Sequence, residues 1–125
     1  MFEVSKEIEF SAAHHLRDYI GKCEHPHGHN WRVRLYIRGP QPLSGGMLID
    51  FGEIKKVLRE VTDRLDHKDL NEVPPFDSLE PSSELLAKYI AEEAAALLDR
   101  EGAYVHRVDV WETRGSCATY IRDDV

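Results

Sequence analysis

Three histidines are spaced so that they can bind one metal ion. The chain has seven histidines in 125 residues, and His27 and His29 flank a single glycine. Residues two apart on a strand point to the same face about 7 Å from one another, so both imidazoles can reach one ion, and Gly28 leaves room for that approach. His14 ends the preceding apolar alternation and can supply a third nitrogen. Three neutral imidazoles suit Zn²⁺ and leave its fourth position open, as catalytic zinc requires.

The alternative is that these histidines are ordinary polar residues at strand ends. A lone inward histidine would favour that interpretation. Three converging histidines favour a metal, because burying several unpaired imidazoles is costly unless something satisfies them. The remaining histidines lack this spacing, so we expect His15 and His25 to be surface or substrate-side residues and His106 to be structural.

Cys23 is a candidate base or nucleophile. It lies four residues before His27 and directly after Lys22, whose positive charge favours a thiolate. The alternative is that Cys23 is a fourth zinc ligand, which would close the site and make it structural. The second cysteine, Cys117, is expected to be a buried strand thiol, and two cysteines are too few for a disulfide-based scaffold.

Two carboxylates could take part in proton transfer or binding. Asp66 directly precedes His67, and a carboxylate beside an imidazole can tune a proton relay, although such a pair at a helix end can be only a cap. Glu112 continues the face of Val108 and Val110 to a strand end. A buried carboxylate there needs a partner rich in hydrogen-bond donors, such as the edge of a guanidine-like heterocycle. Neither signal is specific alone.

Two strands must carry the histidines. Over Phe2–Ala12 the even positions are mainly apolar, and over His27–Arg38 the odd positions are apolar, which is the period of two of a half-buried strand. All three candidate ligands therefore point inward. The connection Arg17–Pro26 is long enough to be a functional loop rather than a tight hairpin.

The rest of the chain predicts two helices and two more strands. Their boundaries are a helix from Asp50 to near Asp66, a loop over Asn71–Pro81, a helix capped by Ser82 or Ser83 and ended by Gly102, and strands over Val105–Glu112 and Ala118–Arg122. The order ββααββ in one domain of residues 1–125 predicts an α+β fold, with both helices on one face of an antiparallel sheet. The other face must be solvated or shared, so we expect a homo-oligomer.

Composition limits the partners. A formal net charge of −7 and a pI near 5.4 oppose broad association with nucleic acid or anionic lipid, so we expect neither as a partner. No run approaches the roughly 20 apolar residues of a membrane helix. The N-terminus alternates apolar and polar residues where a signal peptide would show an apolar block, so we expect a cytoplasmic protein.

Taken in order, these residues resemble a known family. The chain resembles the superfamily of 6-pyruvoyl-tetrahydropterin and 6-carboxy-tetrahydropterin synthases over nearly its whole length. The matching segments are FSAAH at 10–14, Cys23 with HGHN at 27–30, IDF at 49–51, LDH at 65–67 with LN at 70–71, PSSE at 81–84 and WET at 111–113.

The resemblance implies a fold, an assembly and residue roles. The fold would be the tunnelling fold (T-fold), assembled as a homohexamer of two stacked trimers with the active site at a subunit interface. The implied roles are zinc ligands His14, His27 and His29, catalytic thiol Cys23, a proton relay of Asp66 and His67 from a neighbouring subunit, and pterin binding by Glu112, Ser82 and Ser83. This chain has Ser82-Ser83 where the family more often has two threonines, and the hydroxyl is retained.

The spacing of the thiol indicates a branch of the superfamily. Three residues separate Cys23 from His27, which resembles the 6-carboxy-tetrahydropterin synthases of queuosine biosynthesis. That resemblance implies conversion of 7,8-dihydroneopterin triphosphate to 6-carboxy-5,6,7,8-tetrahydropterin, with loss of acetaldehyde and triphosphate. The alternatives are 6-pyruvoyl-tetrahydropterin synthase activity and a non-catalytic zinc scaffold. Three positively charged side chains are candidates to bind the triphosphate: Arg17, Lys22 and Arg114.

Overall fold

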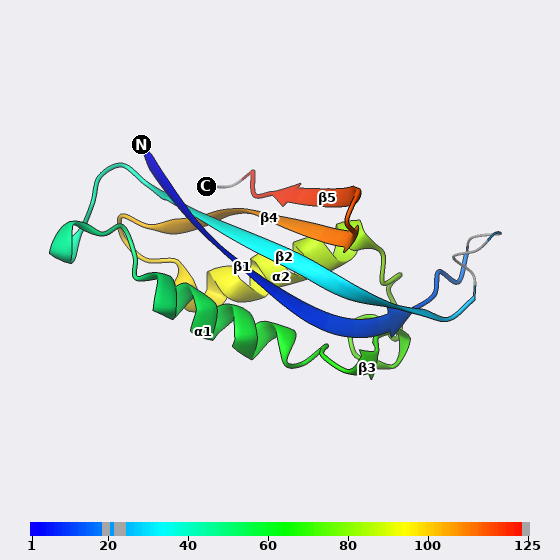
Figure 1. Cartoon of the computed structure of the whole chain (residues 1–125). Coiled ribbons are helices and arrows are strands. Elements are labelled where there is room, and N and C mark those ends of the chain that lie inside the picture. The colour runs from blue at the N-terminus through cyan, green and yellow to red at the C-terminus, as the bar shows by residue number, and fades with distance from the viewer. Residues whose placement is uncertain (19–20, 22–24, 124–125) are drawn as a thin grey trace.

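The long strands that carry the histidines form the centre of a mixed sheet. The computed structural model describes residues 1–18, 21 and 25–123. The sheet has five strands in the order β3-β1-β2-β4-β5 (Figure 1). Its elements along the chain are β1 (Phe2–His14), β2 (His27–Gly39), the 3₁₀ turn η2 (Ser44–Gly46), α1 (Phe51–Thr62), β3 (Lys68–Asp69), the 3₁₀ turn η3 (Leu70–Glu72), α2 (Ser83–Leu98), β4 (Tyr104–Thr113) and β5 (Ser116–Ile121).

The pairing of β1 with β2 is antiparallel and unbroken. It runs from Phe2 opposite Gly39 to His14 opposite His27. The predicted alternation is confirmed over most of both strands, where the inward positions are buried and the positions between them are more exposed. The buried positions are Ile8, Phe10, Ala12 and His14 on β1 and Trp31, Val33, Leu35 and Ile37 on β2.

The first helix is shorter than predicted. Asp50 caps α1 by accepting a hydrogen bond from the Gly52 N–H at 2.6 Å, as the sequence indicated. The helix ends at Thr62 rather than near Asp66, because the chain turns there toward the edge of β1. The His67 N–H donates to the Ser11 carbonyl, and Lys68–Asp69 then pair in parallel with β1. Two residues are too few to give a periodic signal, so the sequence did not predict this strand.

The second helix also ends early. Ser82 caps it by accepting a hydrogen bond from the Leu85 N–H at 3.2 Å. The helix ends at Leu98, short of Gly102, because the carboxylate of Asp99 accepts the Val105 N–H and draws the chain into β4. Gly102, with φ of 87°, makes the turn between the two.

Both helices cover one face of the sheet, which confirms the predicted α+β layers (Figure 1). A single buried cluster joins them to β1, β2 and β4, and α2 contributes small side chains that let it lie close to β4. Within the described part of the chain, neither helix combines the length and the apolar character that crossing a bilayer requires.

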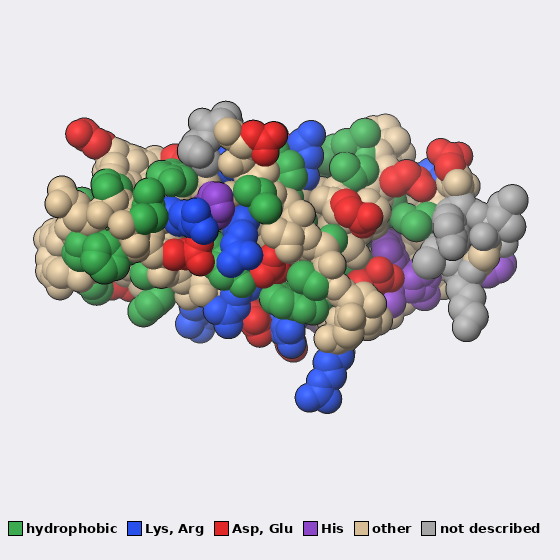
Figure 2. Space-filling view, turned by 90° about the horizontal axis from the view of Figure 1, so that it is seen from above, with side chains coloured by type: hydrophobic (Ala, Val, Ile, Leu, Met, Phe, Trp, Pro, Cys, Tyr) green, Lys and Arg blue, Asp and Glu red, His purple; other side chains and the backbone are tan. Residues whose placement is uncertain are grey.

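The opposite face of the sheet carries charged and aromatic residues. Arg107 lies 3.8 Å above the ring of Tyr36, whose hydroxyl donates to Asp109 at 2.7 Å. Burial and this hydrogen bond raise the pKa of Tyr36 to about 12. From above, the molecule shows basic and acidic side chains interspersed (Figure 2). Cys117, predicted to be a buried thiol, is instead exposed, because it lies on the outermost strand β5.

Gly39 gives a test of the packing at the end of β2. A Cβ on this residue would overlap the carbonyl oxygen of Gly102 and the side chain of Leu48, whereas a Cβ on Gly115 would meet nothing within 4 Å. We expect Gly39→Ala to lower the free energy of unfolding by about 2 kcal/mol, measured by urea denaturation. The control Gly115→Ala should change it by less than about 0.5 kcal/mol. Equal effects of both substitutions would contradict this account of the packing.

Candidate metal centre

Three imidazoles meet where β1 ends and β2 begins. Cross-strand pairing sets His14 opposite His27, and the same-face position on β2 adds His29. Their ring centroids lie 4.5, 4.7 and 5.2 Å apart. The fully buried ring of Trp31 packs edge-on against His14 and His29, with its Nε1–H donating to the Ala12 carbonyl at 3.2 Å. The cluster thus rests on the hydrophobic core.

Backbone carbonyls fix which ring nitrogen faces the centre. His14 Nδ1 lies 2.7 Å from the Pro81 carbonyl oxygen, and His27 Nδ1 lies 2.7 Å from the His25 carbonyl oxygen. A carbonyl oxygen can only accept, so both Nδ1 atoms carry the proton. In the neutral rings the Nε2 lone pairs are then free, and they point at one place, which is the orientation a metal ligand needs.

Glu112 completes the donor set from the end of β4. Its Oε1 lies 2.8 Å from His29 Nε2, 3.3 Å from His14 Nε2 and 3.7 Å from His27 Nε2. His29 Nε2 is buried, and the short contact lacks hydrogen-bond geometry, so this nitrogen has no hydrogen-bond partner in the described chain. Electron-pair donors of four residues therefore converge within 4.8 Å of one another. A cation satisfies all of them, and the three-imidazole, one-carboxylate set suits a divalent transition metal.

The ionisation of the site favours metal binding near neutral pH. Burial lowers the pKa of His29, and the opposing attraction of Glu112 does not cancel that effect. Burial alone would raise the pKa of Glu112, but attraction to the protonated forms of His14 and His29, which exist at acid pH, and a hydrogen bond from Ser83 lower it below its usual value. The site therefore offers a neutral imidazole and an ionised carboxylate.

The second oxygen of Glu112 faces away from the histidines. Glu112 Oε2 accepts a hydrogen bond from the Ser83 hydroxyl at 3.2 Å. Both residues line a hollow of about 370 Å³ between the start of α2 and β5, together with Cys117. The hydroxyl of the neighbouring Ser82 caps α2, and a substrate contact of Ser82 stays a prediction. Glu112 thus stands between the imidazoles and a space that can admit a small molecule.

Asp66 and His67 lie at the edge of the sheet. Asp66 Oδ1 accepts the Ser11 N–H at 2.9 Å, and His67 Nε2 lies 3.7 Å from Asp66 Oδ2. The His67 side chain is 82% exposed, and its φ is 59°. It shares a hollow of about 440 Å³ with His29, but among the described residues no contact joins the pair to the cluster. Cys23 lies outside the described residues.

Sequence reasoning missed two parts of this centre. It assigned Glu112 to substrate alone, although the apolar alternation of β4 already placed its side chain on the histidine face. It also missed the Pro81 carbonyl, because a backbone group has no sequence signature. Gly28 was expected to leave room for the two imidazoles to approach one ion, but a Cβ at this position would contact nothing within 4 Å, so the approach does not require glycine.

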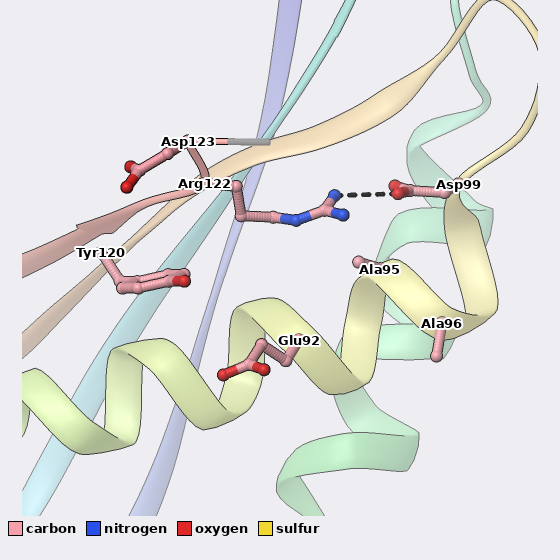
Figure 3. A pocket seen from close by; sticks show the side chains of 7 residues that line it. All are labelled: Glu92, Ala95, Ala96, Asp99, Tyr120, Arg122 and Asp123. Atoms are coloured by element: carbon pink, nitrogen blue, oxygen red, sulfur yellow. Dashed lines mark hydrogen bonds and ion pairs between the residues drawn. The ribbon is translucent and has the colours of Figure 1, made fainter. Parts of the chain in front are cut away.

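A third hollow, of about 470 Å³, lies between α2 and β5 away from the histidines. Figure 3 shows the Arg122 guanidinium crossing it to Asp99, at 2.8 Å. Carboxylates and alanines make up most of the rest of its lining. It contains none of the residues that the sequence predicted to do chemistry.

Comparison with known proteins gives a consistent result. The sequence profile of the 6-pyruvoyl tetrahydropterin synthase family matches residues 3–123. A 6-carboxy-5,6,7,8-tetrahydropterin synthase from Synechocystis sp. is 36% identical over 96% of this chain and 93% of its own length. The human 6-pyruvoyl tetrahydrobiopterin synthase is 31% identical over 94% of this chain and 90% of its own.

Solved structures show the same likeness. The Caenorhabditis elegans 6-pyruvoyl tetrahydropterin synthase superposes with a TM-score of 0.88 at 27% identity, covering 98% of this chain and 96% of that one. This likeness confirms the T-fold that the sequence analysis expected.

Removing one imidazole tests the metal centre. We expect His29→Ala to retain its fold but to lose bound metal on dialysis, because the variant lacks one of the three converging imidazoles that would hold the ion. Elemental analysis of the dialysed protein, with circular dichroism for the fold, measures this. His106→Ala removes a histidine outside the cluster and should keep the metal content of the unsubstituted protein. Equal metal content in both variants would exclude His29 as a ligand.

Proposed function

This chain belongs to the 6-pyruvoyl tetrahydropterin synthase family, and on that premise we propose that it is a zinc-dependent carbon–carbon lyase. The proposed reaction converts 7,8-dihydroneopterin triphosphate to 6-carboxy-5,6,7,8-tetrahydropterin, with release of acetaldehyde and triphosphate, for queuosine-type deazapurine biosynthesis. The observation that carries the proposal is the convergence of three Nε2 atoms and Glu112 Oε1 beside a hollow.

The three histidines would hold the zinc ion. Zinc bound there acts as a Lewis acid that lowers the pKa of the substrate side-chain hydroxyls. The core-packed Trp31 and the carbonyls at Nδ1 keep the imidazoles in place. An orientation set before the ion arrives lowers the entropic cost of binding it.

Glu112 and Ser83 would bind the pterin in the adjoining hollow. The amino-pyrimidinone edge of a pterin presents N–H donors, and a carboxylate oxygen that faces the hollow can accept them. Glu112 Oε2 faces Ser83 and the hollow, whereas Oε1 faces the histidines. One carboxylate can therefore orient the substrate against the metal.

Proton transfer is assigned to Cys23, Asp66 and His67. Cys23 would move protons at pterin C6 and at the side-chain carbons, and His67, oriented by Asp66, would carry the second proton. The high exposure of His67 supports a role in a neighbouring subunit's site, as in the proposed homohexamer. The hexamer and the cytoplasmic location stay predictions.

The branch within the family rests on the short spacing between Cys23 and His27. Identities of 36% and 31% are too similar to separate the two activities. The second candidate is therefore 6-pyruvoyl-tetrahydropterin synthase activity, which eliminates triphosphate but keeps all three side-chain carbons. A zinc scaffold is the remaining alternative.

The products distinguish these activities. We expect the purified zinc protein, incubated with 7,8-dihydroneopterin triphosphate, to release acetaldehyde and a 6-carboxy pterin, identified by mass spectrometry. Prior treatment with a zinc chelator should abolish both, and re-addition of zinc should restore them. A 6-pyruvoyl product would move the enzyme to the other branch, and no turnover by zinc-loaded protein would favour the scaffold.

Substitution of the thiol separates a catalyst from a scaffold. We expect Cys23→Ala to keep its fold and its zinc while turnover falls by roughly 10²–10⁴-fold, because a general base or acid is lost. Metal content, thermal unfolding and turnover should be measured on the same preparation. Loss of zinc together with loss of stability would show that Cys23 is a structural ligand.

A further inference from the structure

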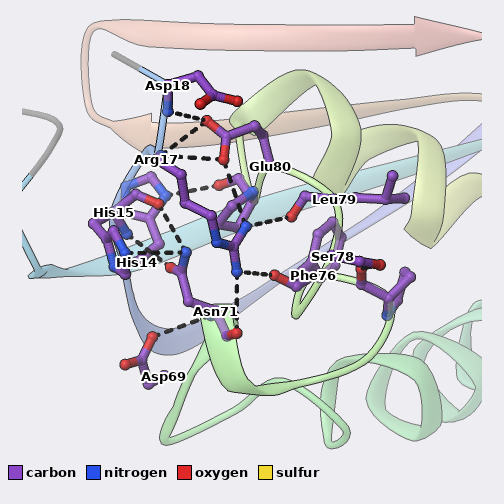
Figure 4. A network of polar contacts seen from close by, with 12 residues as sticks. His14, His15, Arg17, Asp18, Asp69, Asn71, Phe76, Ser78, Leu79 and Glu80 are labelled. Carbon is purple, nitrogen blue, oxygen red and sulfur yellow. Dashed lines mark hydrogen bonds and ion pairs between the residues drawn. The ribbon is translucent and has the colours of Figure 1, made fainter. Parts of the chain in front are cut away.

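Arg17 binds the segment that precedes α2 through its guanidinium group. Its Nη1 donates to the Leu79 carbonyl at 2.9 Å and to Glu80 Oε1 at 3.4 Å. Its Nη2 donates to the Phe76 carbonyl at 2.6 Å and to the Asn71 carbonyl at 3.1 Å (Figure 4). All four acceptors belong to residues 71–80, so one guanidinium holds this loop together.

The backbone of the same region reinforces the attachment. The Arg17 N–H donates to both oxygens of Glu80, at 3.0 and 3.1 Å, and the Asp18 N–H adds a contact at 3.4 Å. Asn71 accepts the His15 N–H at 2.9 Å and donates to the His15 carbonyl at 3.0 Å. Residues 15–18, which directly follow His14, are therefore tied to residues 71–80 at several points.

This network ends on the metal centre. Pro81 directly follows Glu80, and its buried carbonyl accepts the hydrogen bond from His14 Nδ1. The proline ring fixes φ, so the position of Glu80 restricts where the carbonyl group of Pro81 can lie. A path of contacts thus runs from Arg17 through Glu80 and Pro81 to His14, the most buried of the three imidazoles.

The structure assigns Arg17 and Glu80 a positioning role, in which they hold the Pro81 carbonyl against His14 Nδ1 and so orient that imidazole for the metal. This inference rests on the metal-binding part of the proposed function. It also decides against Arg17 as a cation for the substrate triphosphate. The four N–H donors on Nη1 and Nη2 already serve protein acceptors, and a phosphate could bind the guanidinium bidentately only by displacing at least one of these bonds.

Metal affinity tests the inference without any turnover. We expect Arg17→Ala to raise the zinc dissociation constant roughly tenfold, the lower end of the range for groups that act behind a metal ligand, measured by competition with a chromogenic chelator. The visible spectrum of the Co²⁺-substituted protein should also change. Added guanidinium should restore part of the affinity, and Glu80→Gln should shift both readouts in the same direction.

Arg64→Ala provides the matched control. Arg64 also pairs with a glutamate, Glu93, and with Tyr89, but it lies between the two helices away from the histidines. This variant should bind zinc like the unsubstituted protein. If Arg17→Ala is unstable, Arg17→Lys and Glu80→Gln supply the same two readouts, because each keeps part of the network.

Three outcomes would be decisive. Unchanged zinc affinity and Co²⁺ spectrum in the Arg17 and Glu80 variants overturn the positioning role. Weaker binding of inorganic triphosphate by Arg17→Ala, with zinc affinity unchanged, would instead make Arg17 a phosphate-binding residue. Failure of the unsubstituted protein to bind zinc would overturn the proposed function itself, which separates that failure from a failure of this inference.

Discussion

The unbroken antiparallel pairing of β1 with β2 is the constraint on which the metal centre depends. Because His14 stands opposite His27 and His29 is two residues further along the same face, the three rings meet only in this register. A slip by one residue would turn the imidazoles of one strand to the other face and expose the core positions of that strand. The apolar residues that fill the space under the helices therefore also hold the ligands in place, and folding and metal binding share one set of contacts.

The second requirement is an outer layer of backbone groups behind the ligands. The carbonyls of Pro81 and His25 hold the Nδ1 protons of His14 and His27, so that the Nε2 lone pairs face one another. The lone pairs of these Nε2 atoms repel one another when no cation is present, and a bound cation attracts all of them. The loop before α2 thus has a chemical role as well as a connecting one, although it lies far from the histidines in the sequence.

Glu112 links the two halves of the proposed site. One of its oxygens lies among the imidazoles, and the other accepts a hydrogen bond from Ser83 at the start of α2. Since α2 packs mainly on β4, the distance between Ser83 and Glu112 is set by the same core that supports the sheet. The position of the substrate hollow relative to the metal donors is therefore a property of the fold, not of a loop.

The sequence by itself determined the four longer strands, both helices and the inward direction of the three histidines, because periods of 2 and 3.6 residues and helix caps are local signals. It also identified the family, through short motifs in a fixed order. Only the tertiary structure decided that Glu112 joins the histidines and that the Pro81 carbonyl faces His14. It also decided that the Arg17 guanidinium binds backbone carbonyls of the loop before α2, and where each helix ends. These features depend on contacts between residues far apart in the chain, such as Arg17 with Phe76 and His14 with Pro81 or Glu112, or on backbone groups. Neither leaves a periodic trace in a sequence.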